Sequence, residues 1–278
     1  MPKPANAASF VNNQAPHAAG AGRWLRLFAP LVMGVALLAA WEAVVRINDI
    51  PSYLFASPSV IAKTIVAEWS TLAPAWLVTL KTMLVALAAA VIVGVAAAAL
   101  FASSRVLEAT LFPYAVMLQV TPLVAVAPFI VLWLNDRVWL AQVLCAWIVA
   151  FFPILSNTSI GLRSADVGQR DLFDLYGATR WQKLRLLLAP SALPYFLAGL
   201  KISANLALVG AIVGEFVIGP AAENPGLATT ILASQLRQDT PMMFAALAVV
   251  SLSGIVIFFL VHLLSYGLLR RWHESALA

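Results

Sequence analysis

The sequence is poor in charged residues and in the residues that build metal and disulfide sites. Only 10% of its 278 residues are Asp, Glu, Lys or Arg, against about 25% in an ordinary soluble domain. It has one cysteine, Cys145, and three histidines that share no ligand spacing, His17, His262 and His273. A disulfide framework and a metal cluster are therefore excluded. A Gly-rich loop ending in Lys-Ser or Lys-Thr is also missing, so any ATP that drives this protein must bind to another chain.

The chain is instead rich in apolar residues, which make up 62% of the sequence. A soluble fold of this size cannot hide that much apolar surface from water. Six runs are long enough to cross a hydrocarbon core of about 30 Å as helices, namely 27–46, 76–101, 111–134, 138–162, 194–218 and 242–269. They are continuous and rich in Ala, Leu and Val instead of alternating, which favours helices over a barrel. We predict an all-α membrane protein with about six transmembrane helices.

Two stretches outside these runs have a character of their own. Residues 1–22 are rich in Ala, Asn and Pro without the architecture of a cleavable signal, so we expect a disordered tail before a transmembrane domain at 23–278. The segment 219–241 contains Pro220, Pro225 and Gly226 before a short apolar-edged stretch. We predict a half-helix there on the outer surface, which either receives a partner or covers the bundle.

Orientation follows from the Lys and Arg residues of the connecting segments. An even number of spans puts both termini on one side, together with segments 102–110 and 163–193. That side carries eleven basic residues, Lys3, Arg23, Arg26, Arg105, Arg163, Arg170, Arg180, Lys183, Arg185, Arg270 and Arg271. The other side carries three, Lys63, Arg137 and Arg237. We therefore expect both termini and segment 163–193 to be cytoplasmic, and the net charge of +5 needs no nucleic-acid partner.

The cytoplasmic segment is basic and helix-prone, and it lies between two apolar runs. We expect a short helix in which Asp171 and Asp174 are near the N-terminus, where negative charge is favourable. An apolar edge follows at helical spacing, Leu172, Leu175 and Tyr176. Gly177 is a natural helix end. Pro190 and Pro194 should then set a bend at the membrane entrance, because proline cannot continue a helix without losing backbone hydrogen bonds.

Two interpretations of this short helix are open on physical grounds. A helix with an apolar edge and a flexible end fits a cleft in a soluble partner. The same helix also suits an interfacial connector that rests on anionic headgroups. The spacing of Gly177 and Pro190 favours the first interpretation: nine residues follow Gly177 before the run Leu187, Leu188, Ala189 and Pro190.

This spacing resembles the EAA loop of the inner-membrane permeases of ABC importers. The family's Glu-Ala-Ala is replaced here by Asp171, Leu172 and Phe173. Two further stretches, LQVTPLVAVAPFIVLWL and ASPSV at 56–60, resemble the sulfonate, taurine, nitrate and pyrimidine-precursor branch of these permeases. In the second, Ser57 is a plausible N-cap and Pro58 the first helical residue. The resemblance covers roughly residues 50–272.

The resemblance implies a type I ABC importer permease in a bacterial inner membrane, which is not itself an enzyme. It implies a second permease copy, two ATP-binding subunits that dock on the cytoplasmic loops, and a periplasmic solute-binding protein. The residues expected to couple to the ATP-binding subunit are Asp171, Asp174, Leu175, Gly177, Ala178 and Pro190. The expected substrate is a small organic anion such as an alkanesulfonate, and the alternative is an aromatic or heterocyclic vitamin precursor.

Polar groups and prolines within the spans are candidates for the solute pathway. Gln119, Asn157 and Asn205 could line it or join helices by hydrogen bonds. Pro122 and Pro128 either kink the third span into a gate or are tolerated because neighbours repair the lost hydrogen bonds. Glu215 differs from the others because no basic residue lies within four positions, so its carboxylate needs a partner from elsewhere. We expect Glu215 in the outer gate or the upper pathway wall.

Two other functional classes fit the sequence less well. A secondary transporter usually shows coupling carboxylates near mid-bilayer and repeated halves, whereas the acidic residues here are near span ends and no internal repeat is visible. An intramembrane enzyme needs a nucleophile with a base. Ser253 and His262 share the last run but are separated by about 13 Å along a helix, so they cannot pair directly.

Overall fold

The computed structural model describes residues 21–134, 137–219 and 224–270, with side chains from Phe28 onward. Every regular element in these ranges is helical, as predicted. The chain divides into two compact units, one ending at Ile50 and the other beginning at Pro51. Residues 1–20 of the expected disordered tail lie outside the described residues, and its last two positions, Ala21 and Gly22, belong to the first helix.

The first unit is the single helix α1, Ala21–Ile47. Its apolar stretch from Phe28 to Ile47 is long enough to cross a membrane, which confirms the first predicted run. The two charged residues near its end pair with each other: Arg46 Nε donates to Glu42 Oε1 at 2.6 Å, one turn apart in the favourable order.

The second unit carries the remaining helices. They are α2 (Pro58–Ala67), α3 (Trp69–Ser103), α4 (Arg105–Val120), α5 (Leu123–Trp133), α6 (Val138–Arg163), α7 (Val167–Leu175), α8 (Arg180–Lys183), a π-helical turn (Leu184–Leu188), α9 (Ala189–Ile218), α10 (Leu227–Leu236) and α11 (Thr240–Leu269). Within the described ranges, five helices of the chain are long and apolar enough to span a membrane, and the pair α4 and α5 makes a sixth if counted as one span. The prediction of about six spans is confirmed. The short helices α2 and α10 also lie where the sequence indicated them.

The third predicted run, 111–134, is not one straight helix. It breaks at Thr121 and Pro122 into α4 and α5, whose axes differ in direction by 103°. Pro122 has no backbone N–H and fixes its own φ, so the helix ends before it and a new one begins after it. Pro128, in contrast, lies inside α5 without interrupting it. Of the two prolines, only Pro122 breaks the span.

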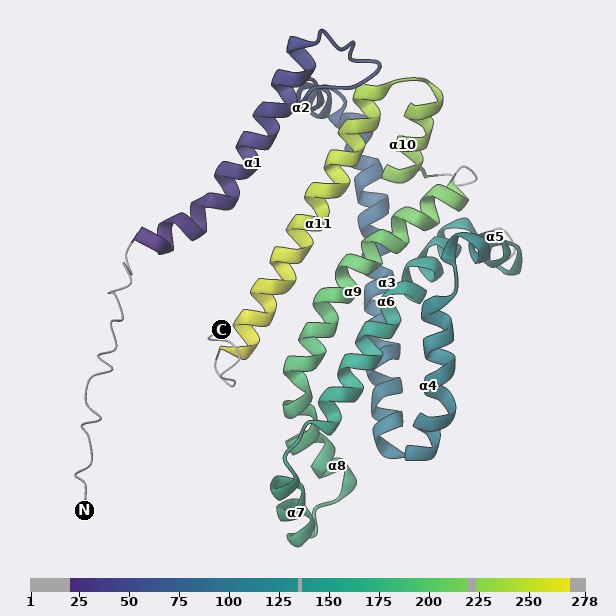
Figure 1. Cartoon of the computed structure of the whole chain (residues 1–278). Coiled ribbons are helices and arrows are strands. Elements are labelled where there is room, and N and C mark those ends of the chain that lie inside the picture. Colours follow the sequence, from purple (N-terminus) through teal and green to yellow (C-terminus); the bar gives the residue numbers. More distant parts are fainter. Residues whose placement is uncertain (1–20, 135–136, 220–223, 271–278) are drawn as a thin grey trace, which may run out of the picture. The chain divides into compact units, whose positions relative to one another are not determined.

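The centre of the second unit is the antiparallel pair α6 and α9, and α3 packs against both, mainly against α6 (Figure 1). Small residues bring the two helices close together. A Cβ added to Gly210 would lie 2.7 Å from the Cα of Ala146, and one added to Gly199 would lie 2.7 Å from the carbonyl oxygen of Pro153. Ser203 adds a hydrogen bond of 2.7 Å to the Ala150 carbonyl. Such packing holds helices together in lipid, where the hydrophobic effect does not.

Candidate functional site

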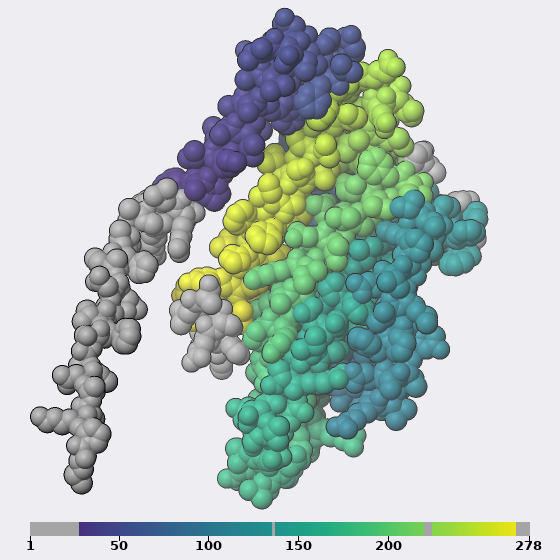
Figure 2. All heavy atoms as spheres, viewed as in Figure 1, coloured from purple at the N-terminus to yellow at the C-terminus, as the bar shows by residue number. Residues whose placement is uncertain are grey.

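The predicted coupling segment, 163–193, forms a lobe at one end of the second unit, below the long helices in Figure 2. It consists of α7, a tight turn, α8 and the π-helical turn that leads into α9. Arg170 ties α7 to the end of α6 by donating from Nη2 to the carbonyls of Leu162 and Arg163, at 3.2 and 2.8 Å. Lys183 forms an ion pair with Asp174 and so joins α8 to α7.

The helix α7 begins earlier than the sequence indicated. Its N-cap is Asp166, whose side chain accepts a hydrogen bond from the Gln169 N–H at 3.2 Å. Asp171 and Asp174 therefore lie in the middle and last turn of α7, and the prediction that they mark its N-terminus is wrong. The residue that fills this role was overlooked, although an Asp ahead of an amphipathic stretch is an ordinary N-cap signal. Asp174 instead stabilises the segment through its pairing with Lys183.

The end of α7 is a Schellman turn built around Gly177. Gly177 has φ of +66°, the left-handed conformation that other residues adopt only at a cost. The Gly177 N–H donates to the Asp174 carbonyl at 3.0 Å, and the Ala178 N–H donates to the Phe173 carbonyl at 2.9 Å. The turn confirms the predicted helix end at Gly177 and reverses the chain into α8, whose first turn carries a Thr179–Gln182 capping box.

Large apolar side chains on this lobe are exposed. Leu175 is 83% and Tyr176 81% exposed, and Leu172, on the same helix, is also exposed. Leu172 and Leu175 share α7 with Arg170, Asp171 and Asp174, so the helix is too polar to be a span, and Tyr176 is its C-cap residue. Exposed apolar side chains grouped on a polar helix are typical of a surface that another molecule covers.

The chain continues as a helix through Pro190 and Pro194, so neither proline ends it, and the bend that they should set stays a prediction. Both prolines lie within α9. Pro190 occupies the first turn of α9, directly after the π-helical turn Leu184–Leu188. A wider π turn relieves the clash between a proline ring and the carbonyl four residues before it, and it absorbs the missing N–H.

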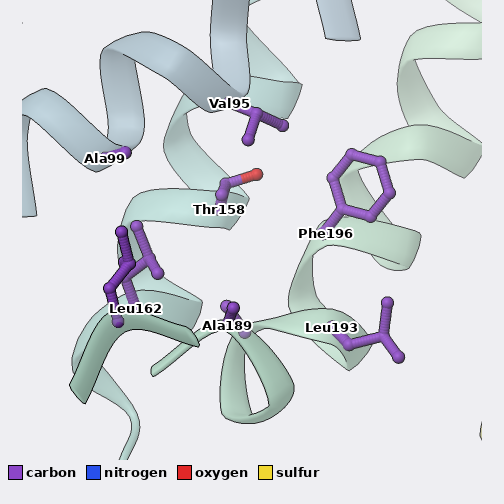
Figure 3. Close-up of a pocket in the computed structure, with 9 residues that line it drawn as sticks. Val95, Ala99, Thr158, Leu162, Ala189, Leu193 and Phe196 are labelled. Atoms are coloured by element: carbon purple, nitrogen blue, oxygen red, sulfur yellow. The ribbon is translucent and has the colours of Figure 1, made fainter. Parts of the chain in front are cut away.

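An apolar cavity of about 310 Å³ lies behind this π-helical turn, between α3, α6 and α9 (Figure 3). Leu184, the first residue of the turn, and Ala189, which follows the turn, contribute to the wall of the cavity. The Thr158 hydroxyl group points into the cavity and has no hydrogen-bond partner among the described residues. The coupling segment is therefore backed by open apolar space instead of a filled core.

A second, more polar cavity of about 520 Å³ lies between α4, α6 and α9. It contains the ion pair of Glu108 with Arg163, and four hydroxyl groups, those of Ser156, Ser159, Ser164 and Tyr195. Ser159 is buried, and its hydroxyl has no partner within the described part of the chain. The sequence analysis missed this site, although the run Ser156–Asn157–Thr158–Ser159 inside a span was a visible signal.

The structure separates the pathway candidates into two groups. Gln119, Pro122 and Pro128 are exposed on the broken pair α4 and α5. Asn157 and Asn205 are half-buried on α6 and α9. The Asn157 amide donates to the Pro153 carbonyl of its own helix at 2.9 Å.

Glu215 belongs to neither group. It is completely buried near the end of α9, and its Oε2 accepts a hydrogen bond from the Ala228 N–H at 3.0 Å. The partner that we predicted for the Glu215 carboxylate is therefore a backbone N–H group at the start of α10. Ser253 and His262 have structural contacts as well: Ser253 accepts from Trp76 Nε1 at 2.8 Å, and His262 stacks on Phe258.

Comparison with known proteins agrees with this architecture. The chain is 35% identical to the riboflavin transport system permease protein of Chloroflexus aurantiacus, over 91% of this chain and 92% of that protein. It is 33% identical to the formylaminopyrimidine transport permease protein of Halalkalibacterium halodurans, over 82% of this chain and 89% of that one. A solved structure of an amino acid ABC transporter shares the fold with a TM-score of 0.60 at 19% identity, covering 73% of this chain and 96% of that one.

The family match extends over most of the transmembrane region. Residues 90–273, from the middle of α3 to beyond the end of α11, match the family described as the binding-protein-dependent transport system inner membrane component. This range includes the lobe with the Gly177 turn, the broken span and the short helix α10. The match rules against a secondary transporter. The chain belongs to the inner-membrane permease family of binding-protein-dependent ABC importers.

Proposed function

We propose that this chain, paired with a second copy, forms the translocation pathway of an importer for a small solute, and that its lobe at 163–193 is where an ATP-binding subunit docks. As a member of its family, the chain works with an ATP-binding subunit and a solute-binding protein, and ATP is hydrolysed on the separate subunit. We propose in addition that the complex contains two permeases and two ATP-binding subunits, and that the residues named below form the contact. We also propose the orientation, with both termini and the lobe in the cytoplasm.

The observation that carries the docking role is the exposed apolar edge of α7. Leu175 and Tyr176 are exposed and come directly before the Gly177 turn, which fixes the end of α7. The backbone N–H of Ala178 closes the turn with its hydrogen bond. Pro190 lies at the start of α9, the helix through which a movement of the lobe would be passed on into the membrane. The alternative, a connector resting on lipid headgroups, would also cover the apolar edge, so the experiment must separate the two.

The docking role is tested by co-purification of the ATP-binding subunit with the permease. Leu175→Ala and Tyr176→Ala shorten the apolar edge and should each reduce the captured subunit and the solute uptake in parallel. Leu236→Ala is the matched control for capture of the ATP-binding subunit, because Leu236 is 79% exposed but belongs to α10 at the other end of the unit (Figure 1). Equal capture by all three variants, with weaker binding of the lobe to anionic vesicles, would favour the headgroup connector and refute docking.

The broken span supports a pathway role for Gln119, Pro122 and Pro128. Irregular backbone at membrane depth is tolerated where it is buried in protein or lines a water-filled cavity, not where it faces lipid. Because the break at Thr121 and Pro122 is exposed on the single chain, we propose that it faces the second copy and the solute. We propose that the packed helices behind this pathway support it through three residues, Asn157, Asn205 and Glu215.

Cross-linking between copies tests this arrangement. In a Cys145→Ala background, Gln119→Cys should give a cross-linked permease dimer with a short bifunctional reagent in membranes. Ile92→Cys is the control, because Ile92 is also exposed on the single chain but lies on α3. A dimer from Ile92→Cys and none from Gln119→Cys would place the broken span away from the second copy.

For the substrate, we propose a heterocyclic vitamin or vitamin precursor, with a small organic anion such as an alkanesulfonate as the second candidate. The first is supported by the two relatives, whose names specify riboflavin and formylaminopyrimidine. The solute-binding protein that co-purifies with the complex should be titrated with riboflavin, a formylaminopyrimidine and an alkanesulfonate. Saturable binding of the sulfonate alone would reverse the order of the two candidates.

A further inference from the structure

The start of α10 is capped by side chains from two other helices. The first N–H groups of any helix have no partner inside the helix. The N-cap residue of α10 is Gly226, which has no side chain that could accept a hydrogen bond from these N–H groups. The Leu227 N–H donates instead to Thr79 Oγ1 on α3 at 2.9 Å, and the Ala228 N–H donates to Glu215 Oε2 on α9 at 3.0 Å. We call Thr79 and Glu215 the shared cap.

The shared cap is shielded from the surroundings. Thr79 is 1% and Glu215 0% exposed, and both residues that they cap are buried too. A Cβ on Gly226 would overlap the Glu215 carboxyl group, so the absence of a side chain lets the carboxyl group lie against the helix start. A carboxylate at a helix N-terminus also meets the positive end of the helix dipole. Glu215 forms no ion pair within the described residues, so this contact accounts for its placement.

The helix that carries Glu215 also begins at the coupling lobe. From Arg180 to Ile218 the chain is helical without a break, over 39 residues. At 1.5 Å per residue this stretch is roughly 58 Å long, enough to cross the membrane. One of its ends follows the Gly177 turn by three residues, and the other holds α10 through Glu215. The lobe and α10 are therefore joined by a single helical element.

We propose that the shared cap couples α10 to the coupling lobe through α9, so that a solute-binding protein acting on α10 and an ATP-binding subunit acting on the lobe move the same helix. Glu215 and Thr79 are then positioning residues for coupling and do not bind the solute. This inference rests on the proposed function for its two partners, whereas the cap itself is a property of the chain alone.

The first experiment measures amide hydrogen exchange at the start of α10 in the purified complex. Thr79→Val removes the acceptor of the Leu227 N–H at nearly constant volume, and Glu215→Ala removes that of the Ala228 N–H. Each should speed exchange in the peptide that begins α10 by about tenfold. Glu215→Gln keeps an oxygen acceptor and should remain near wild type. Wild-type protection in both Thr79→Val and Glu215→Ala would overturn the cap.

Thr82→Val is the matched control for Thr79→Val. Thr82 lies on α3 and is also completely buried, but its hydroxyl accepts from Trp139 Nε1 at 3.1 Å. This variant should leave the exchange of α10 unchanged. If Thr82→Val deprotects α10 as strongly as Thr79→Val, general loosening of α3 explains the effect and the cap is refuted.

The second experiment measures coupling in proteoliposomes as the ratio of ATPase activity with and without the solute-loaded binding protein. In Glu215→Ala and Thr79→Val the ratio should fall towards one and uptake should fall with it, while the ATP-binding subunit still co-purifies. Full stimulation in a variant whose α10 is deprotected would overturn the coupling role. Absence of stimulation in the wild type would refute the proposed function and the coupling role, and the exchange result would still decide whether the cap exists.

Discussion

Replacement of Gly177 by valine tests the coupling lobe most directly. A Cβ at Gly177 would have no atom within 4 Å, so the substitution causes no clash. The entire penalty is in the backbone, because φ is +66°. An L-residue in the left-handed conformation costs roughly 1–2 kcal/mol, and branching at Cβ adds to this. A cost of that size lowers the ratio of native to open turn by a factor of about 5–30.

The expected consequence is local. When the Schellman turn opens, the hydrogen bonds from Gly177 and Ala178 are lost and the direction of the apolar edge is no longer fixed. Capture of the ATP-binding subunit and solute uptake should both fall in parallel with the fraction of chains that keep the native turn, while the membrane helices remain inserted. The assays are quantitative co-purification from membranes and uptake at limiting expression of the ATP-binding subunit.

Two further variants make the prediction specific. Gly177→Asn should retain most of the activity, because asparagine tolerates the left-handed conformation better than other residues with a side chain. Gly267→Val is the control: a Cβ there also meets nothing within 4 Å, but this glycine lies in α11 with ordinary helical φ. Wild-type capture and uptake in Gly177→Val would refute the argument that the turn positions a docking helix.

Three other outcomes are expected. Gly210→Ala should lower thermal stability in detergent by about 1–3 kcal/mol, because its Cβ would lie 2.7 Å from the Cα of Ala146 and force α6 and α9 apart; an unchanged melting temperature would contradict the close packing. Asp166→Ala should remove the N-cap of α7 at a cost of about 1 kcal/mol, seen as faster amide exchange at the start of α7 but not of α10. In a Cys145→Ala background, Leu236→Cys should react with an impermeant thiol reagent in intact cells and Arg180→Cys only after permeabilisation, and the reverse pattern would invert the orientation.

The sequence by itself determined the class of the protein and most of its helices. Apolar content and run length are decisive for a membrane protein, because a backbone in lipid must satisfy its own hydrogen bonds and a helix does so locally. The end of α7 at Gly177 and the start of α2 at Pro58 followed from single residues, because glycine tolerates a positive φ and proline suits the first helical position. The spacing of Gly177 and Pro190 was enough to indicate the permease family.

Only the tertiary structure decided which helices depend on distant residues. Pro122 and Pro128 look alike in the sequence, yet one lies at the break of a span and the other inside a helix. Pro190 continues a helix because a π turn precedes it. Glu215 and Thr79 are separated by more than a hundred positions, so no local pattern could show that both cap α10. A hydrogen bond between side chain and backbone depends on distance in space, and the packing of α3 and α9 alone brings these groups together.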